Sequence, residues 1–163
     1  MARHGVALAA LMLSLVGVSD GLAEGKGNAL ANLKCVILYV EIGTEADAEK
    51  HGIGQASLEK LARAQLKSKM PRLRTTDPAN SCSNKLYMKL DSEDTGPVFV
   101  YHVGLHLFRS GHLTETGKPY IAGAWSLGIV NWARRGFVSS GVREAYEDLF
   151  EAFAGEYYLG GNK

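Results

Sequence analysis

Apolar residues recur along the chain at two different spacings, and each spacing predicts a different kind of element. Residues 33–42 form a nearly continuous run rich in β-branched and aromatic side chains, which predicts a mostly buried strand. From Gln55 to Met70 the apolar positions recur every three or four residues, which predicts a surface helix. Pro71 ends that pattern, because proline interrupts the hydrogen bonding of a helix.

Three further strands follow a polar loop. Turn-forming residues over 75–84 predict the loop. A short strand then covers 85–90, and a longer one covers 98–109, where apolar residues alternate onto one face. The last strand covers 120–130, so we expect these three strands to form an antiparallel meander.

The clearest helix closes the chain. Ser139 or Ser140 is suited to cap its N-terminus, an apolar stripe that includes Leu149 and Phe153 follows, and Gly160 ends it. The element order is therefore βαβββα. This order predicts an α+β fold, a mixed four-stranded sheet with two amphipathic helices packed on one face.

The first 23 residues have the organisation of a secretory signal peptide. A short basic start with Arg3 precedes an apolar run over residues 6–18, and small residues up to Ala23 fit a cleavage site. The run is shorter than the roughly 20 residues that span a bilayer, so a retained membrane anchor is the less favoured alternative. We expect residues 1–23 to be removed after Ala23, leaving residues 24–163 as a single periplasmic or secreted α/β domain without an integral membrane segment.

The two cysteines suit a disulfide. Cys35 opens the first predicted strand and Cys82 lies just before the second. The starts of adjacent parallel strands are neighbours, and an exported protein meets an oxidising compartment in which a disulfide persists. We expect a Cys35–Cys82 bridge, and two unpaired thiols are the alternative.

Charge and motif content argue against several functions. The formal net charge of +1 gives no electrostatic footprint for nucleic acid. Residues 52–57 begin like a dinucleotide fingerprint but lack its last glycine and its tight turn after a strand. Asp91, Glu93 and Asp94 lack the spacing of a calcium loop. We therefore expect no cofactor.

His102 and His106 form a His-x-x-x-His pattern. On a helix both imidazoles would share one face and would be able to hold a metal ion. Their surroundings predict a strand instead, which separates the two Cα atoms by roughly 13 Å. Metal-to-nitrogen bonds are only about 2 Å long, so we expect two histidines on the outer face of the sheet and no metal site. A small metal-dependent or hydrolytic enzyme that uses them with His112 and Asp91 is the alternative.

Aromatic and guanidinium groups gather near the last strand. Trp125, Trp132, Arg134 and Arg135 combine side chains that often mark recognition surfaces. We expect Trp125 to cover the core and Trp132, in the loop after the strand, to be exposed. The candidate binding residues are therefore Trp132, Arg134 and Arg135.

The C-terminal third resembles a group of uncharacterised exported bacterial proteins. The residues that carry the resemblance are Trp125-Ser126-Leu127-Gly128-Ile129 and the helix with Phe153 and Tyr157. The resemblance also extends loosely over residues 36–66. The order of elements is also similar to small α/β domains of envelope proteins, such as the amino-terminal domain of TolB and the penicillin-binding-protein activator lipoproteins. Unlike the latter, this chain lacks a cysteine at the predicted cleavage site, and the resemblance implies no catalytic residues.

These observations favour a non-enzymatic, exported module that binds an envelope partner protein or a small ligand. The periplasmic enzyme described above is one alternative. A structural or oligomerising envelope subunit, whose exposed strand edge pairs with another chain, is the second.

Overall fold

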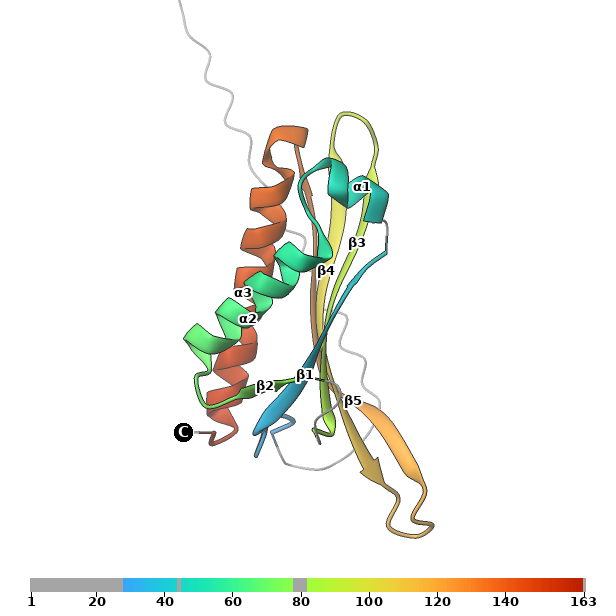
Figure 1. The fold of residues 1–163 in the computed structure, drawn as a ribbon, viewed down its shortest axis with the longest axis vertical. Helices are drawn as coiled ribbons and strands as arrows, with labels where there is room; N and C mark the ends of the chain where they lie inside the picture. The colour runs from blue at the N-terminus through green and yellow to red at the C-terminus, as the bar shows by residue number, and fades with distance from the viewer. Residues whose placement is uncertain (1–27, 44, 78–81, 163) are drawn as a thin grey trace, which may run out of the picture.

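The computed structural model describes residues 28–43, 45–77 and 82–162, whose fold is shown in Figure 1. The predicted signal peptide, residues 1–23, lies outside the described residues. Among the described residues, none of the helices combines the length and apolar character that crossing a bilayer requires. The elements are β1 (Cys35–Ile42), α1 (Glu45–Lys50), α2 (Gln55–Lys69), β2 (Arg74–Thr76), β3 (Asn84–Asp94), β4 (Phe99–His112), β5 (Pro119–Ala133), the 3₁₀ helix η1 (Arg135–Phe137) and α3 (Val138–Leu159).

The strands form one mixed sheet in the order β2-β1-β3-β4-β5. β1 runs parallel to both β2 and β3, whereas β3, β4 and β5 are antiparallel neighbours. The predicted α+β class, the parallel contact between the first two predicted strands and the antiparallel meander are confirmed. The described residues form five strands and three α-helices, so the prediction of four strands and two helices was wrong in this detail.

The two elements that the sequence did not predict are short. β2 has three residues, overlaps the segment 75–84 predicted as loop, and pairs with the beginning of β1. α1 has six residues and lies in a polar stretch. Neither is long enough to show a period, because alternation needs about four residues and helical spacing about ten to be recognised.

Two predicted boundaries were also wrong. β3 continues past its predicted end at Leu90 to Asp94, because β4 continues to supply pairing partners. α3 begins at Val138, and neither Ser139 nor Ser140 caps it. The 3₁₀ helix η1 leads directly into α3, so the chain turns helical before either serine.

The hydrophobic core lies between the sheet and the helices α2 and α3, which cover the same face of the sheet (Figure 1). On this side Trp125 of β5 contacts Phe153 of α3, with ring centroids 5.0 Å apart, so its predicted core position is confirmed. Burial of one such large side chain stabilises the fold by roughly 1.5–3 kcal/mol. The buried residues of the two main elements are Phe99, Tyr101, Val103, Leu105 and Leu107 on β4, and Val142, Ala145, Tyr146, Leu149, Phe150, Phe153, Ala154 and Tyr157 on α3.

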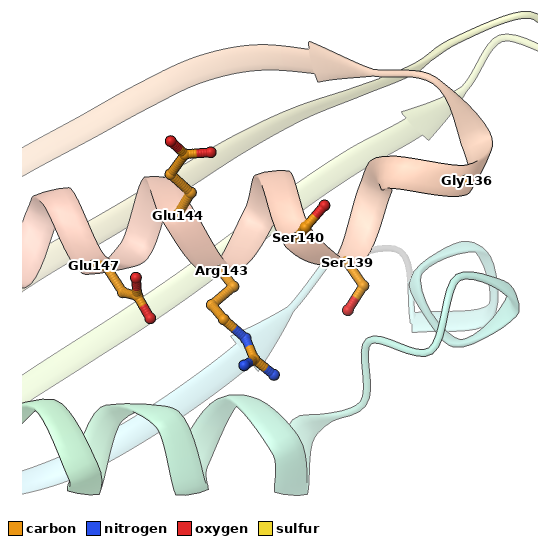
Figure 2. A pocket seen from close by; sticks show the side chains of 6 residues that line it. All are labelled: Gly136, Ser139, Ser140, Arg143, Glu144 and Glu147. Atoms are coloured by element: carbon orange, nitrogen blue, oxygen red, sulfur yellow. The ribbon is translucent and has the colours of Figure 1, made fainter.

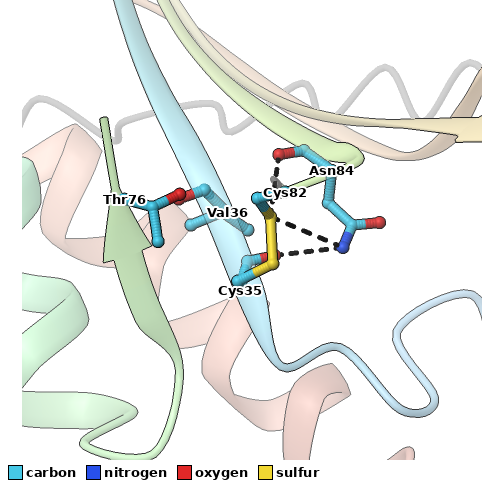
Figure 3. The surroundings of a disulfide bond; sticks show 5 residues. All are labelled: Cys35, Val36, Thr76, Cys82 and Asn84. Carbon is cyan, nitrogen blue, oxygen red and sulfur yellow. Dashed lines mark hydrogen bonds between the residues drawn. A yellow bond between two sulfur atoms is a disulfide. The ribbon is translucent and has the colours of Figure 1, made fainter. Parts of the chain in front are cut away.

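A disulfide joins Cys35, at the start of β1, to Cys82, just before β3 (Figure 3). The two Cα atoms are 6.1 Å apart, so the predicted bridge is confirmed. The side-chain amide of Asn84 donates a hydrogen bond of 3.1 Å to the carbonyl oxygen of Cys35. The covalent bond and the hydrogen bond therefore fix the same corner of the sheet.

Replacing both Cys35 and Cys82 with alanine is expected to lower the free energy of unfolding by about 2–4 kcal/mol. The bridge spans a sequence separation of 47 residues, and its loss releases the unfolded chain from that constraint. Urea unfolding of the oxidised protein and of the double variant measures the difference. Equal midpoints would contradict this role of the disulfide.

Phe153→Ala is expected to lower the free energy of unfolding by about 3–5 kcal/mol, because it leaves a cavity beside Trp125 in the fully buried core. Phe137→Ala is the matched control, since the Phe137 side chain is 68% exposed, and it should change stability by about 0.5 kcal/mol or less. Thermal or urea unfolding compares the two. Similar losses in both variants would show that α3 does not anchor the core.

Candidate functional site

Within the described residues, one face of the sheet carries no helix (Figure 1). Because side chains alternate across a strand, the neighbours of the buried residues point to this second face, which we call the open face. Paired residues form rows across it: Tyr39, Tyr87, His106 and Ser126 make one row, and Glu41, Lys89, Gly104 and Gly128 make the next. Residues far apart in sequence therefore lie side by side. The open face consists of Tyr39, Glu41, Lys85, Tyr87, Lys89, Asp91, Val100, His102, Gly104, His106, Phe108, Ser126, Gly128, Val130 and Trp132.

Aromatic rings on the open face pack against one another. Tyr39 and Tyr87 are stacked with ring centroids 4.9 Å apart, and Phe108 meets Tyr87 edge to face at 5.2 Å. The ammonium of Lys85 lies 5.9 Å from the centre of the Tyr39 ring. Tyr39, Tyr87 and Phe108 thus contact one another across β1, β3 and β4, and these contacts stabilise the sheet.

Both histidines of the His-x-x-x-His pattern lie on the open face, as predicted. Nδ1 of His106 is 2.6 Å from the Ser126 hydroxyl oxygen. Nδ1 of His102 is 3.7 Å from a carboxylate oxygen of Asp91, and the Lys89 ammonium lies 3.0 Å from the same oxygen. Each imidazole therefore has its Nδ1 beside an oxygen atom, which sequence reasoning did not anticipate.

The Ser126 and His106 pair does not form a hydrolytic triad with Asp91. A triad needs the carboxylate on the second nitrogen of the same imidazole that contacts the serine. Asp91 is paired with Lys89 and lies beside His102 instead. His112 is at the far end of β4, paired with Pro119. Within the described residues, nothing assembles the hydrolytic alternative.

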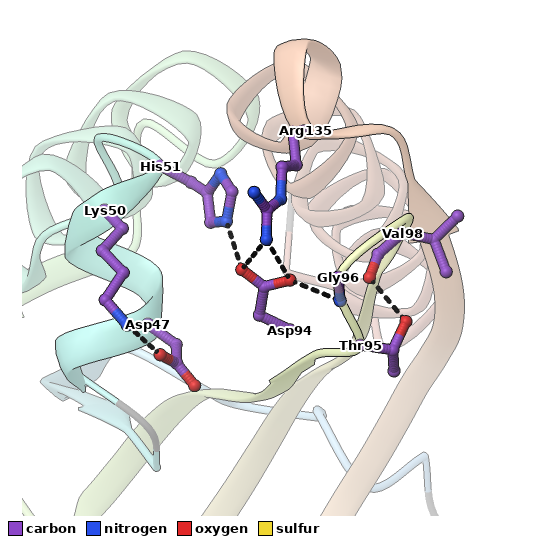
Figure 4. A network of polar contacts seen from close by, with 8 residues as sticks. All are labelled: Asp47, Lys50, His51, Asp94, Thr95, Gly96, Val98 and Arg135. Atoms are coloured by element: carbon purple, nitrogen blue, oxygen red, sulfur yellow. Dashed lines mark hydrogen bonds and ion pairs between the residues drawn. The ribbon is translucent and has the colours of Figure 1, made fainter.

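The candidate binding residues Trp132, Arg134 and Arg135 are all exposed, and they have different neighbours. Trp132 lies within β5 rather than in the predicted loop, opposite Val100 on the open face, and is 60% exposed. Its predicted exposure is therefore confirmed. Arg135 forms an ion pair with Asp94 at 3.2 Å (Figure 4). Arg134, which stands between Trp132 and Arg135 in the sequence, is also exposed.

Asp94 is the centre of the polar network shown in Figure 4. The backbone N–H of Gly96 donates to its carboxylate over 2.9 Å, and Nε2 of His51 lies 3.6 Å away. The Gly96 hydrogen bond, followed by the Arg135 guanidinium, lowers the pKa of the Asp94 carboxyl despite its partial burial. This network links the residue that follows α1, the β3–β4 turn and η1 at one end of the sheet.

β5 is an edge strand of 15 residues that pairs only with β4 within the described part of the chain. It carries no charged residue. The β3–β4 ladder ends at Arg109, so the β4–β5 hairpin projects beyond the rest of the sheet (Figure 1). The large exposed apolar residues of β5 are Tyr120, Ile121, Leu127, Val130 and Trp132.

A shallow depression lies along the first half of α3 (Figure 2). Arg143 and Glu147 point toward α2, whereas Ser140 and Glu144 point away from it. The side chains therefore do not converge on one point, as a small-ligand site requires. Among the described residues no group of three or more His, Cys, Asp or Glu side chains is placed to hold a metal ion. The residues that line the depression are Gly136, Ser139, Ser140, Arg143, Glu144 and Glu147.

Comparisons with known proteins give a weak structural likeness. No family model matches the chain, and no curated protein matches it. Among solved structures, a dodecamer of a PelC variant from Paraburkholderia phytofirmans is similar at 18% sequence identity and a TM-score of 0.46. The alignment covers 77% of this chain and 88% of that chain.

The pKa of His106 is expected to lie below its ordinary value near 6.5, because burial, the neighbouring His102 and the Lys89 charge all disfavour the imidazolium. As the pH falls, the unfolded chain takes up this proton before the folded one. The contribution to stability is therefore complete above pH 6.5 and is lost as the pH falls through the folded pKa. An NMR titration measures the midpoint, and His106→Ala should flatten the slope of stability with pH. A midpoint at or above 6.5 would contradict this environment.

Proposed function

We propose that this protein is an exported, non-enzymatic module that binds a partner protein chain along the free edge of β5. The observation that carries the proposal is the length and chemistry of that edge. The Cys35–Cys82 disulfide supports export, because such a bond persists in an oxidising compartment.

The two edges of the sheet differ in how they are protected. An unpaired edge presents backbone N–H and C=O groups that can pair with another strand, and proteins commonly block this with short strands, charges or proline. β2, at one edge, has only three residues and includes Arg74. β5 has 15 residues, no charge, and a proline only at its first position. The β5 edge is therefore the one suited to strand addition.

Exposed apolar side chains reinforce the choice of edge. Among the described residues ten large hydrophobic side chains are exposed, and five of them are on β5. Leu127 lies on the helix side of the strand, opposite Leu105, while Val130 and Trp132 lie on the open face. A strand added beside β5 would cover apolar surface on both faces of the sheet while it satisfies the free backbone groups.

A protein partner fits better than a small ligand. Small-molecule sites are usually concave, mostly apolar, and have a few convergent polar groups. The depression on α3 is lined by polar side chains that diverge (Figure 2). Three of the aromatic rings on the open face, those of Tyr39, Tyr87 and Phe108, are packed against one another.

Self-association through the same edge is the second candidate function. Two copies of β5 can pair antiparallel without like-charge repulsion, because the strand is uncharged. The protein would then be an oligomerising subunit rather than a receptor for a different chain.

Val130→Lys tests the proposal, since it places a charge on the β5 edge at a side chain that is 74% exposed and should leave the fold intact. Leu159→Lys, at a 79% exposed side chain of α3, is the matched control. Retention of a partner from envelope extract by the immobilised protein should fall by about tenfold or more with Val130→Lys alone, the loss that roughly 1.4 kcal/mol produces.

Light scattering on the same three proteins separates the two candidates. An oligomer that dissociates only in Val130→Lys would identify a second copy as the partner. Equal retention and equal mass in all three proteins would contradict binding at the β5 edge.

A further inference from the structure

Two glycines face each other at the centre of the open face. Gly104 of β4 and Gly128 of β5 are direct partners in the antiparallel ladder. The imidazoles of His102 and His106 lie over the space that is left because the two glycines have no side chains. A Cβ atom at Gly104 would be 2.5 Å from Nε2 of His106, and one at Gly128 would be 2.6 Å from Nε2 of His102.

The two Nε2 atoms therefore lie above neighbouring points of the sheet. The Cβ positions of directly opposed residues are about 4.5–5.5 Å apart. His106 leans back along β4 and His102 leans across toward β5, so their nitrogens approach although the Cα atoms are roughly 13 Å apart. The sequence argument used only the separation of the Cα atoms and did not take the direction of the two side chains into account.

The other nitrogen of His106 is within hydrogen-bond distance of an oxygen atom, and that of His102 lies near a carboxylate. Metal-binding histidines commonly donate their second N–H to a carboxylate, a backbone carbonyl or a water oxygen, which leaves a lone pair on the ligating nitrogen. The Ser126 hydroxyl lies 2.6 Å from Nδ1 of His106, and the Asp91 carboxylate lies 3.7 Å from Nδ1 of His102. Both Nε2 atoms are thus the ones turned to the space above the glycines.

We propose that His102 and His106 bind one divalent transition-metal ion through their Nε2 atoms, above Gly104 and Gly128. Two imidazoles leave coordination positions for water or for a ligand atom of another molecule. Imidazole pairs suit Cu²⁺, Ni²⁺ and Zn²⁺, and Cu²⁺ binds such nitrogen ligands most tightly. The site is on the open face rather than at the backbone edge of β5, so it does not depend on the proposed strand addition.

Titration of Cu²⁺ into the full chain tests the site. A His4→Ala background removes the histidine of the N-terminal segment, and calorimetry then measures stoichiometry and affinity. We expect one Cu²⁺ per chain, with nitrogen hyperfine structure in the electron paramagnetic resonance spectrum. His102→Ala and His106→Ala should each weaken binding by about tenfold or more.

Two further variants separate a shared site from scattered surface binding. His112→Ala removes an exposed histidine of the same strand and should leave the affinity unchanged. Gly104→Ala keeps both histidines but places a methyl group where the His106 ring lies, so it should weaken binding while circular dichroism stays unchanged. Binding that survives both His102→Ala and His106→Ala, or no binding at all, would overturn the proposal.

Discussion

The packing of α3 across β4 and β5 is the contact on which the rest of the structure depends. The apolar stripe of α3 meets the alternating buried residues of β4, and Phe153 reaches Trp125 on β5. This contact shields one face of a five-stranded sheet with a single layer of helices. The other face and the outer edge of β5 carry no helix or strand within the described residues. Because the described helices cover only one face, the open face and the edge of β5 are the surfaces of the sheet that remain accessible.

The open face and the β5 edge offer different chemistry. The open face is organised by its own contacts, with stacked tyrosines at one end and two histidines above paired glycines near its centre. The β5 edge offers backbone hydrogen-bonding groups and uncharged, partly apolar side chains. At the opposite side of the sheet, the Cys35–Cys82 bond fixes the start of β1 against β3. The protein thus combines a covalently fixed side with an edge that no other strand covers within the described residues.

The sequence predicted the elements that face the core. β4 and α3 each repeat apolar residues over many positions, and the disulfide follows from two parallel neighbouring strands. It did not predict the open face, because Tyr39, Tyr87 and His106 are brought together by strand register rather than by local spacing. Trp132 was assigned to a loop, because nothing in its neighbourhood reveals that β4 pairs with β5 as far as Ala133. The sequence also did not predict the direction in which the two imidazoles tilt, because they tilt toward glycines that belong to different strands.

Amide hydrogen exchange along β5 tests the central claim most directly, since it reports which backbone groups are already paired. In the isolated monomer, slow and fast amides should alternate along the strand, because only those directed at β4 are hydrogen-bonded. The fast set should become protected when a partner chain binds. Uniform slow exchange along β5 in the monomer would show that the edge is already covered, and would contradict the account.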